Sequence, residues 1–183
     1  MRGGAELLQI RAKEDSSAAL LALVERAVVT TRRGGARLVV NDRADLARLA
    51  DADGVHVGQT DLPVESVRSL VGSDKIVGLS THDRAQVDAA LVGAATYIAV
   101  GPIFTTATKE TGYEARGLDL VSYAAGRGKP VVAIGGITLE RAPAVIQAGA
   151  SALAVITDLL AGDDPESRVR AYLERLPHQP FNV

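Results

Sequence analysis

The sequence predicts an α/β protein in which parallel strands close into a barrel. Short apolar runs alternate with helical stretches, glycine stands at most of the predicted helix ends, and polar residues follow nearly every apolar run. Alternating β and α elements with short connections imply a parallel sheet. An open doubly wound sheet also satisfies this pattern. A (β/α)8 TIM barrel fits better, because it brings the polar residues at all the strand ends to one mouth.

Seven apolar runs are the candidate strands. They are short and rich in Val, Ile and Leu, and several lack polar alternation, as expected of parallel strands that are covered on both faces. A chain of 183 residues suits one domain, so we expect residues 1–183 to form a single barrel-like domain. The runs are residues 7–10, 38–40, 55–57, 76–79, 97–100, 131–134 and 153–156.

Two helices have the clearest sequence signals. Residues 16–31 place Leu20, Leu23 and Val24 at helical spacing. The last helix is expected to begin near residues 163–166, where acidic capping residues are followed by a proline in the first turn. Glycines such as Gly72 and Gly149 stand shortly before the next strand, where a left-handed helix terminator belongs.

The start of the chain resembles the end of a helix. Residues 2–5 (RGGA) repeat the pattern of residues 33–36 (RGGA), which join a predicted helix to a strand. We therefore expect a (β/α)8 barrel that lacks its first β/α unit, with seven recognisable strands and an N-terminally truncated domain. The first and last strands would then have unpaired edges. A natural seven-stranded or open sheet is the alternative.

Composition excludes several classes of function. The formal net charge of −2 argues against broad electrostatic binding to nucleic acid or an anionic membrane, although a local cationic pocket is compatible with it. Without cysteine there is neither a disulfide nor a thiolate metal site. No apolar run approaches the length of a membrane span and no signal peptide is visible, so we expect a cytoplasmic protein that acts on small molecules. The oligomeric state, including a homo-oligomer, stays open.

Polar residues at the first three strand ends suggest a phosphate and metal site. Period-two spacing places Gln9, Arg11 and Lys13 on one face of an extended chain, where the two cations could hold a phosphate; a solvated, frayed strand end is the alternative. Asp42 and Asp61 follow neighbouring strands, and two such carboxylates suit Mg²⁺ beside phosphate oxygens. Helix capping is the alternative for both aspartates.

Later strand ends extend this picture. Residues 80–83 offer Ser80, Thr81 and His82 for substrate binding or for helix capping, whereas His56 lies inside a strand and reads as a hydrogen-bonded core histidine. The longest connection, residues 101–117, is a candidate lid; a connection without function is the alternative. Residues 135–136 are paired glycines and residues 155–158 end the last strand. With one unit missing, these are the seventh and eighth strand ends, which often form the phosphate site of such barrels.

Taken together, these segments resemble thiamine phosphate synthase, of the superfamily that also contains thiazole tautomerases. Any one match would be weak, but seven in the family's order over nearly the whole chain are specific. Thr157 stands where that family often has serine, and the hydroxyl is kept. The matching segments are residues 9–13 (QIRAK), 41–47 (NDRADLA), 54–61 (GVHVGQTD), 78–82 (GLSTH), 101–109 (GPIFTTATK), 133–137 (AIGGI) and 154–157 (AVIT).

The resemblance implies a reaction and a set of roles. The family joins hydroxymethylpyrimidine diphosphate to thiazole phosphate and releases diphosphate, with Mg²⁺ as cofactor. Asp42 and Asp61 would ligate the magnesium. Gln9 and Ser80 would lie near the pyrimidine. The diphosphate would be held by Arg11, Lys13, Asn41 and Lys109, and the thiazole phosphate by Thr106, Thr108, Gly136, Ile156 and Thr157. Arg11, Lys13, Ser80 and Lys109 would form the catalytic set.

Two other functions remain as alternatives. A thiazole tautomerase has a similar sequence but performs proton transfer, and His82 could be its acid or base. The diphosphate and magnesium residues favour the synthase over it. A barrel that binds a thiamine precursor without turnover is the non-enzymatic alternative, and the retention of all the polar strand-end residues disfavours it.

Overall fold

One parallel sheet of seven strands forms the centre of the molecule. The computed structural model describes residues 2–105 and 113–176. Each strand pairs with the next one along the chain, so the order in the sheet is β1 to β7, as the sequence predicts. The strands are β1 (Leu7–Ile10), β2 (Arg37–Asn41), β3 (Gly54–Val57), β4 (Ile76–Thr81), β5 (Tyr97–Val100), β6 (Val131–Ile134) and β7 (Ala152–Ala154).

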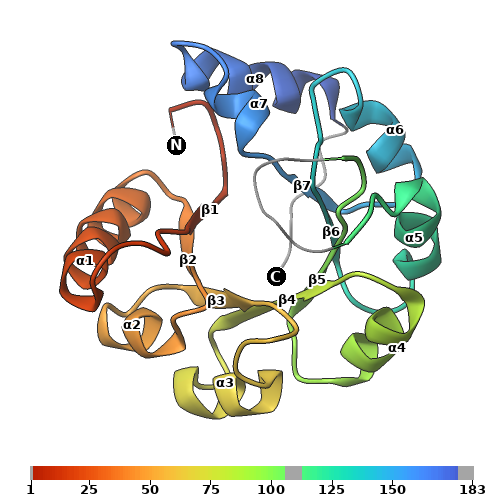
Figure 1. Ribbon diagram of the computed structural model, residues 1–183. Helices are drawn as coiled ribbons and strands as arrows, with labels where there is room; N and C mark the ends of the chain where they lie inside the picture. Colours follow the sequence, from red (N-terminus) through yellow and green to blue (C-terminus); the bar gives the residue numbers. More distant parts are fainter. Residues whose placement is uncertain (1, 106–112, 177–183) are drawn as a thin grey trace.

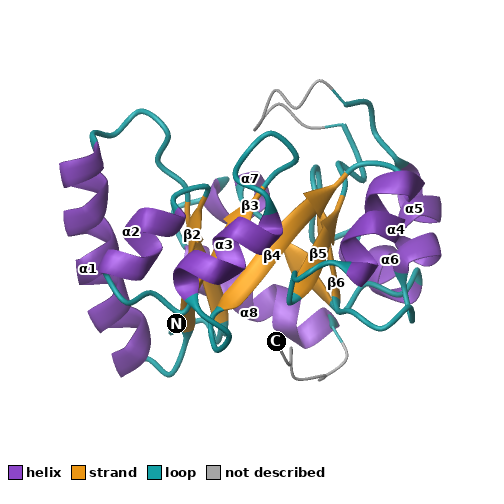
Figure 2. Ribbon diagram, turned by 90° about the horizontal axis from the view of Figure 1, so that it is seen from below, coloured by secondary structure: helices purple, strands orange, loops and turns teal. Residues whose placement is uncertain are grey.

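Helices lie outside the curled sheet, as Figures 1 and 2 show from two directions. The two helices with clear sequence signals are present. Ser16 caps α1 by accepting a hydrogen bond from the amide of Ala19, and Asp164 caps α8 by accepting from the amide of Ser167. The helices are α1 (Ser17–Arg33), α2 (Ala44–Leu49), α3 (Val64–Val71), α4 (Arg84–Val92), α5 (Gly117–Ala124), α6 (Ala142–Gln147), α7 (Thr157–Leu160) and α8 (Pro165–Arg175).

The sheet separates an outer core from a smaller inner one. Val55 and Val57 of β3 pack outward in a cluster that also contains Val24 of α1. A second cluster contains Val39, Ile76 and Tyr97, with Ala99 and Val132. Side chains alternate between the two faces of a strand. Asn41, two positions beyond Val39 on β2, and Ser80, four positions beyond Ile76 on β4, therefore point toward the same interior, near the carboxyl ends of the strands.

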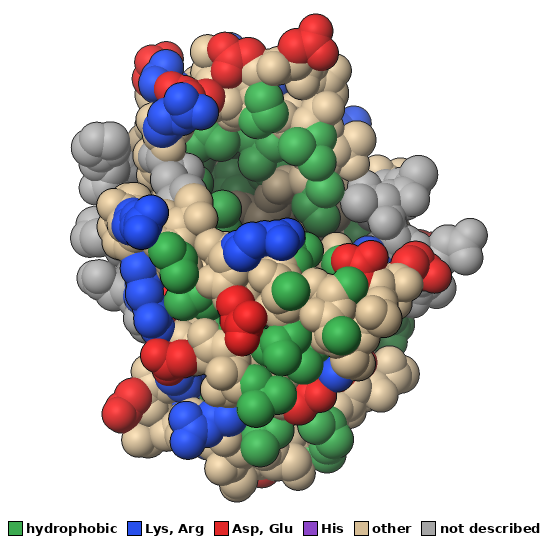
Figure 3. All heavy atoms as spheres, turned by 90° about the vertical axis from the view of Figure 1, so that its left-hand side faces the viewer, with side chains coloured by type: hydrophobic (Ala, Val, Ile, Leu, Met, Phe, Trp, Pro, Cys, Tyr) green, Lys and Arg blue, Asp and Glu red, His purple; other side chains and the backbone are tan. Residues whose placement is uncertain are grey.

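The barrel is open between β1 and β7, which are the two edges of the sheet. Figure 1 shows the strands curling toward each other without closing, and Figure 3 shows a hollow lined with hydrophobic side chains on this face. The segment before β1 lies along α8. A Cβ atom on Gly3 would stand 2.9 Å from the Cβ of Val169, and Arg2 forms a 3.4 Å ion pair with Glu166. Within the described residues, no helix combines the length and apolar character needed to cross a bilayer.

Candidate active site

The carboxyl ends of the first three strands bring one lysine and two aspartates together. Lys13 follows β1, Asp42 directly follows β2, and Asp61 lies in the loop after β3. The Nζ atom of Lys13 stands 3.1 Å from Oδ2 of Asp42. The side chain of Asp42 is only 20% exposed, whereas that of Lys13 is 47% exposed. The residues predicted for diphosphate and metal binding are therefore neighbours in space.

The carboxyl group of Asp42 is in an unfavourable position as an anion. Burial raises its pKa, the hydrogen bond and charge of Lys13 lower it, and the nearby carboxyl of Asp61 raises it again; the net direction is upward. One cation thus does not balance two adjacent carboxylates. Mg²⁺ commonly takes one or two carboxylates and completes its shell with water and substrate phosphates, so this donor set fits it.

Neither aspartate caps a helix, so that alternative is wrong for both. The N-cap residue, which directly precedes the helix, is Arg43 for α2 and Pro63 for α3. Neither helix has a hydrogen bond to a capping side chain. Asp61 instead accepts a 2.7 Å hydrogen bond from the amide of Gly58 through Oδ2, which closes its own loop. Asp42 has a φ of 62°, in the left-handed region that asparagine and aspartate tolerate better than most residues.

Gln9, predicted to lie near the pyrimidine, and two further residues predicted for the diphosphate belong to the first two strands or directly follow them. Gln9 belongs to β1, Arg11 follows that strand, and both are exposed at the open edge of the sheet. Asn41 is the last residue of β2 and stands in register with His56 of β3. The structure therefore places Gln9, Arg11 and Asn41 on the strands that also carry Lys13 and the two aspartates.

Ser80 is buried inside the barrel, not at the start of a helix. Its side chain is 3% exposed, and its Oγ lies 2.8 Å from Nε2 of His56. Asp83 caps α4 by accepting a hydrogen bond from the amide of Gln86, so capping by Ser80 or Thr81 is wrong. His56 is the hydrogen-bonded core histidine that its position within a strand predicts.

At the far side of the mouth, the strand ends of β6 and β7 carry the predicted phosphate residues. Gly135 and Gly136 have φ values of 91° and 64°, and a Cβ on Gly136 would approach the carbonyl oxygen of Thr105 to 2.6 Å. Only glycine fits this close approach. Ile156 is 49% exposed and directly precedes α7, which begins at Thr157. Thr106, Thr108 and Lys109 lie outside the described residues, as do the other residues of the segment 106–112 within the predicted lid.

Three residues at or near this mouth carry contacts that were not predicted. The hydroxyl of Tyr97 forms a hydrogen bond with Nδ1 of His56, and Gln59 donates a 2.7 Å hydrogen bond to the carbonyl of Ser80. Asp158 fixes the loop after β7 through Arg168 and Tyr172 of α8; burial works to raise its pKa, but these hydrogen bonds prevail and the pKa is lowered. Only Tyr97 had a sequence signal, because an isolated glycine in a strand, here Gly78, marks a close approach.

The open barrel and the polar groups at one mouth define a class: a (β/α)-barrel protein whose candidate site lies at the carboxyl ends of the strands. Comparison with known proteins narrows it. The family model described as thiamine monophosphate synthase matches residues 1–159. The chain therefore belongs to the thiamine monophosphate synthase family.

Individual relatives agree with this family. The chain is 42% identical to the thiamine-phosphate synthase of Roseiflexus sp. (strain RS-1) over 172 residues, which are 93% of this chain and 73% of the relative. It is 43% identical to that of Saccharopolyspora erythraea, with 95% and 82% covered. The structure is similar to the thiamine phosphate pyrophosphorylase from Pyrococcus furiosus, with a TM-score of 0.88, 28% identity and coverage of 95% and 84%.

Proposed function

We propose that this chain joins hydroxymethylpyrimidine diphosphate to thiazole phosphate and releases diphosphate, in a magnesium-dependent reaction. The observation that carries the proposal is the group formed by Lys13, Asp42 and Asp61, where two carboxylates and one lysine meet at the mouth. Family membership and the 42–43% identity to thiamine-phosphate synthases support the same reaction.

The chemistry asks the chain mainly to stabilise a leaving group. The bond between the pyrimidinylmethyl carbon and the diphosphate oxygen breaks, and its electron pair leaves with the diphosphate. Arg11 and Lys13 supply positive charge at the strand ends where that negative charge develops, and Asn41 adds an amide donor. A magnesium ion held by Asp42 and Asp61 supplies further charge neutralisation for the diphosphate.

Capture of the cation requires the second substrate to be held in place. The lone pair of the thiazole nitrogen forms the new C–N bond to the pyrimidinylmethyl cation. We assign the thiazole phosphate to the ends of β6 and β7, where Gly136, Ile156 and Thr157 follow the strands. Thr106, Thr108 and Lys109 complete this assignment by resemblance. Ser80 and Gln9 are assigned to the pyrimidine.

A rate measurement with both substrates tests the proposal. We expect thiamine phosphate and diphosphate to appear in equal amounts, and only when both substrates and Mg²⁺ are present. Removal of magnesium with a chelator should stop the reaction, and adding it back should restore it. Isomerisation of the thiazole substrate alone would favour a tautomerase, for which His82 is the candidate; in the structure its Nδ1 hydrogen-bonds with the carbonyl of Gly101. Binding of either substrate without any product would favour the non-catalytic alternative.

A further inference from the structure

A chain of hydrogen bonds crosses three strands inside the barrel and ends at Ser80. The hydroxyl of Tyr97 on β5 lies 2.8 Å from Nδ1 of His56 on β3, and Nε2 of His56 lies 2.8 Å from Oγ of Ser80 on β4. The tyrosine and histidine rings stack with their centroids 5.6 Å apart. All three side chains are buried.

The tyrosine and the histidine meet because the strand between them carries a glycine. Gly78 of β4 stands in register with His56 on one side and Tyr97 on the other. A Cβ atom on Gly78 would lie 2.2 Å from Cζ of Tyr97 and 2.5 Å from Nδ1 of His56. Any side chain there would therefore occupy the position of this hydrogen bond. The contact is built into the sheet.

The chain of hydrogen bonds has a preferred direction. Burial raises the pKa of Tyr97 above its ordinary value, so the phenol keeps its proton. A phenol is a stronger acid than an aliphatic hydroxyl, and it is accordingly the stronger donor of the two hydroxyls that contact the imidazole. Donation from Tyr97 to Nδ1 of His56 would leave the imidazole hydrogen on Nε2, where it would be donated to Oγ of Ser80.

We propose that Tyr97 acts through His56 as a positioning residue that makes Ser80 a hydrogen-bond donor to the pyrimidine substrate. With its oxygen already accepting from His56, Ser80 offers its own proton to the next partner. It therefore selects an acceptor, such as a ring nitrogen of the pyrimidine, over a donor such as an amino group. This inference rests on the proposed function, because that function supplies the pyrimidine.

Replacement of the remote hydroxyl tests the proposal through kinetics. Tyr97→Phe keeps the ring and removes only the donor. We expect kcat/KM for the pyrimidine diphosphate to fall about 5- to 10-fold, chiefly through KM, since one oriented hydrogen bond is weakened. The KM for thiazole phosphate should not change. Tyr123→Phe is the matched control, because its hydroxyl bonds Asp88 on the surface, 2.9 Å away, and it should behave as wild type.

A double variant separates positioning from general damage. If Tyr97 acts through Ser80, then Tyr97→Phe should add little to the loss caused by Ser80→Ala. Additive losses, or equal increases in both KM values, would overturn the proposal and assign Tyr97 a purely structural role. If the wild-type chain itself shows no turnover with both substrates and magnesium, the proposed function fails, and the test below still examines the hydrogen-bond chain.

The tautomer of His56 can be measured in the unmodified protein, which removes any dependence on how well a variant folds. The chain has three histidines, so their imidazole nitrogens can be assigned by ¹⁵N NMR. We expect the hydrogen of His56 to reside on Nε2 in the wild type and to shift partly to Nδ1 in Tyr97→Phe. A hydrogen on Nδ1 in the wild type would reverse the chain and overturn the proposal.

Discussion

Two aspartates with the same unusual backbone conformation lie at opposite ends of the barrel, and their surroundings shift their pKa values in opposite directions. Asp42 and Asp51 have φ values of 62° and 53°, both in the left-handed region. Asp42 follows β2 at the carboxyl ends of the strands. Asp51 lies between α2 and β3, at their amino ends. The backbone alone therefore does not decide what either carboxylate does.

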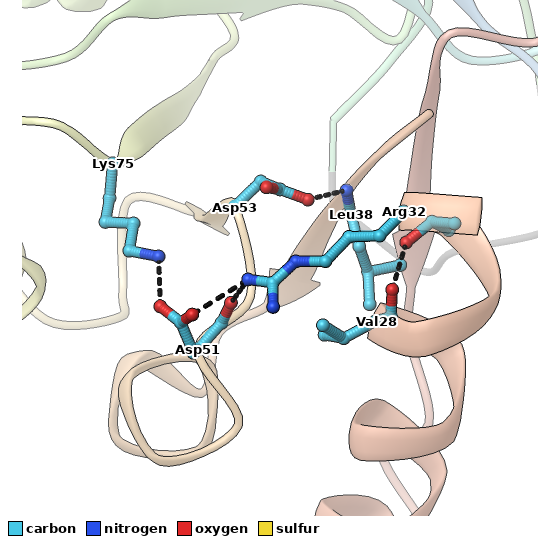
Figure 4. A network of polar contacts seen from close by, with 7 residues as sticks. Val28, Arg32, Leu38, Asp51, Asp53 and Lys75 are labelled. Atoms are coloured by element: carbon cyan, nitrogen blue, oxygen red, sulfur yellow. Dashed lines mark hydrogen bonds and ion pairs between the residues drawn. The ribbon is translucent and has the colours of Figure 1, made fainter. Parts of the chain in front are cut away.

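Among the described residues, Asp51 has two cationic partners and no competing carboxyl in contact with it. Lys75 approaches one carboxylate oxygen to 2.6 Å and Arg32 the other to 2.8 Å, and Arg32 also donates to the Asp51 carbonyl (Figure 4). Hydrogen bonds from Lys75 and Arg32 lower the pKa of Asp51 to about 2. Nearby, Asp53 accepts a 2.7 Å hydrogen bond from the amide of Leu38. This end of the barrel ties α1, β2, β3 and β4 together.

Around Asp42 the charges do not balance. Its pKa is raised, with Lys13 as its cation and Asp61 as a competing carboxyl. An uncompensated anion in the free protein costs stability, but it is satisfied when a cation and a phosphate arrive together. The carboxylate that two cations hold lies at the amino end of the barrel, whereas the carboxylate with one cation and a competing carboxyl lies at the carboxyl end, where barrels of this kind carry their active sites.

The largest expected effect is the difference in turnover between two single variants, each with an aspartate replaced by asparagine at one end of the barrel. Asparagine tolerates the left-handed backbone, so Asp42→Asn and Asp51→Asn remove the charge with little strain. We expect Asp42→Asn to reduce turnover about 100-fold or more, because one ligand of the proposed magnesium ion is lost. Asp51→Asn should keep turnover close to wild type. The measurement is kcat with both substrates across a magnesium titration.

Near-normal turnover of Asp42→Asn at limiting magnesium would remove this residue from the metal site. Loss of turnover in Asp51→Asn without loss of folded protein would equally break the comparison, because it would give the amino end of the barrel a catalytic role. Circular dichroism of both variants provides the control for folding.

The two lysines offer a second, smaller contrast. Lys13→Gln removes the cation beside Asp42, and we expect kcat/KM for the pyrimidine diphosphate to fall about 10- to 30-fold, the value of one charge-assisted hydrogen bond. The effect is smaller than that of Asp42→Asn because Arg11 and the metal remain. Lys75→Gln removes the cation beside Asp51 at the amino end of the barrel, and it should change kcat/KM by less than about twofold. Equal losses of kcat/KM in both variants would show that the substrate responds to the total charge of the protein and not to contact with Lys13.

The sequence predicts the strands and clear helices well because each rests on local physics. Apolar runs, an N-terminal cap at Ser16 and another at Asp164 fix their elements within a few residues. The last strand is the exception. Its apolar run suggests residues 153–156, but β7 ends at Ala154, and Thr157 already begins α7. Periodicity does not distinguish the end of a short strand from the turn into a helix.

The sequence predicts which residues lie at the candidate site better than it predicts which atoms of those residues are in contact. Strand ends identify Asp42 and Asp61, but a sequence does not show that the two carboxyls are close enough to raise a pKa. The capping alternative for Ser80 was reasonable locally and is wrong, because Asp83 is better placed for α4. The hydroxyl of Tyr97 reaches His56 across an intervening strand, and such contacts depend on sheet register, which local patterns leave open.

The open edge between β1 and β7 distinguishes the two aspartates further, because β1 leads into Lys13, the partner of Asp42, whereas Asp51 lies between α2 and β3. We propose that residues 1–183 form one domain in which β1 and β7 are the unpaired edge strands of the described sheet. A chain extended by one strand and one helix ahead of residue 1 should melt about 5–10 °C higher, because about 1 kcal/mol shifts Tm by about 2–4 °C at this size and buried backbone groups gain partners. The shorter chain should also self-associate more.

Thermal melts and light scattering on both lengths make this measurement. The Asp51→Asn variant in both backgrounds is the control, and its effect should be independent of length. Equal melting temperatures with both chains monomeric would show that the edges are satisfied in another way.

The smallest expected effect concerns the pH dependence of stability at the amino end. The pKa of Asp51 is about 2 in the folded chain against an ordinary 3.8, so its ionised form favours folding. This contribution is complete above about pH 5 and is lost as the pH falls toward 2. Because the side chain of Asp51 is 61% exposed, solvent screening limits this contribution to about 1 kcal/mol or less.

Urea unfolding of wild type and Asp51→Asn at pH 6 and pH 3 measures the effect. The difference in unfolding free energy between the two proteins should be smaller at pH 3 than at pH 6. Asp42→Asn should have the opposite sign. The raised pKa of Asp42 makes its anion unfavourable in the folded chain, so this variant should be more stable than wild type at pH 6, and the gain should shrink at pH 3. A loss of stability at pH 6 in both variants would mean that the two ends are not electrostatically distinct.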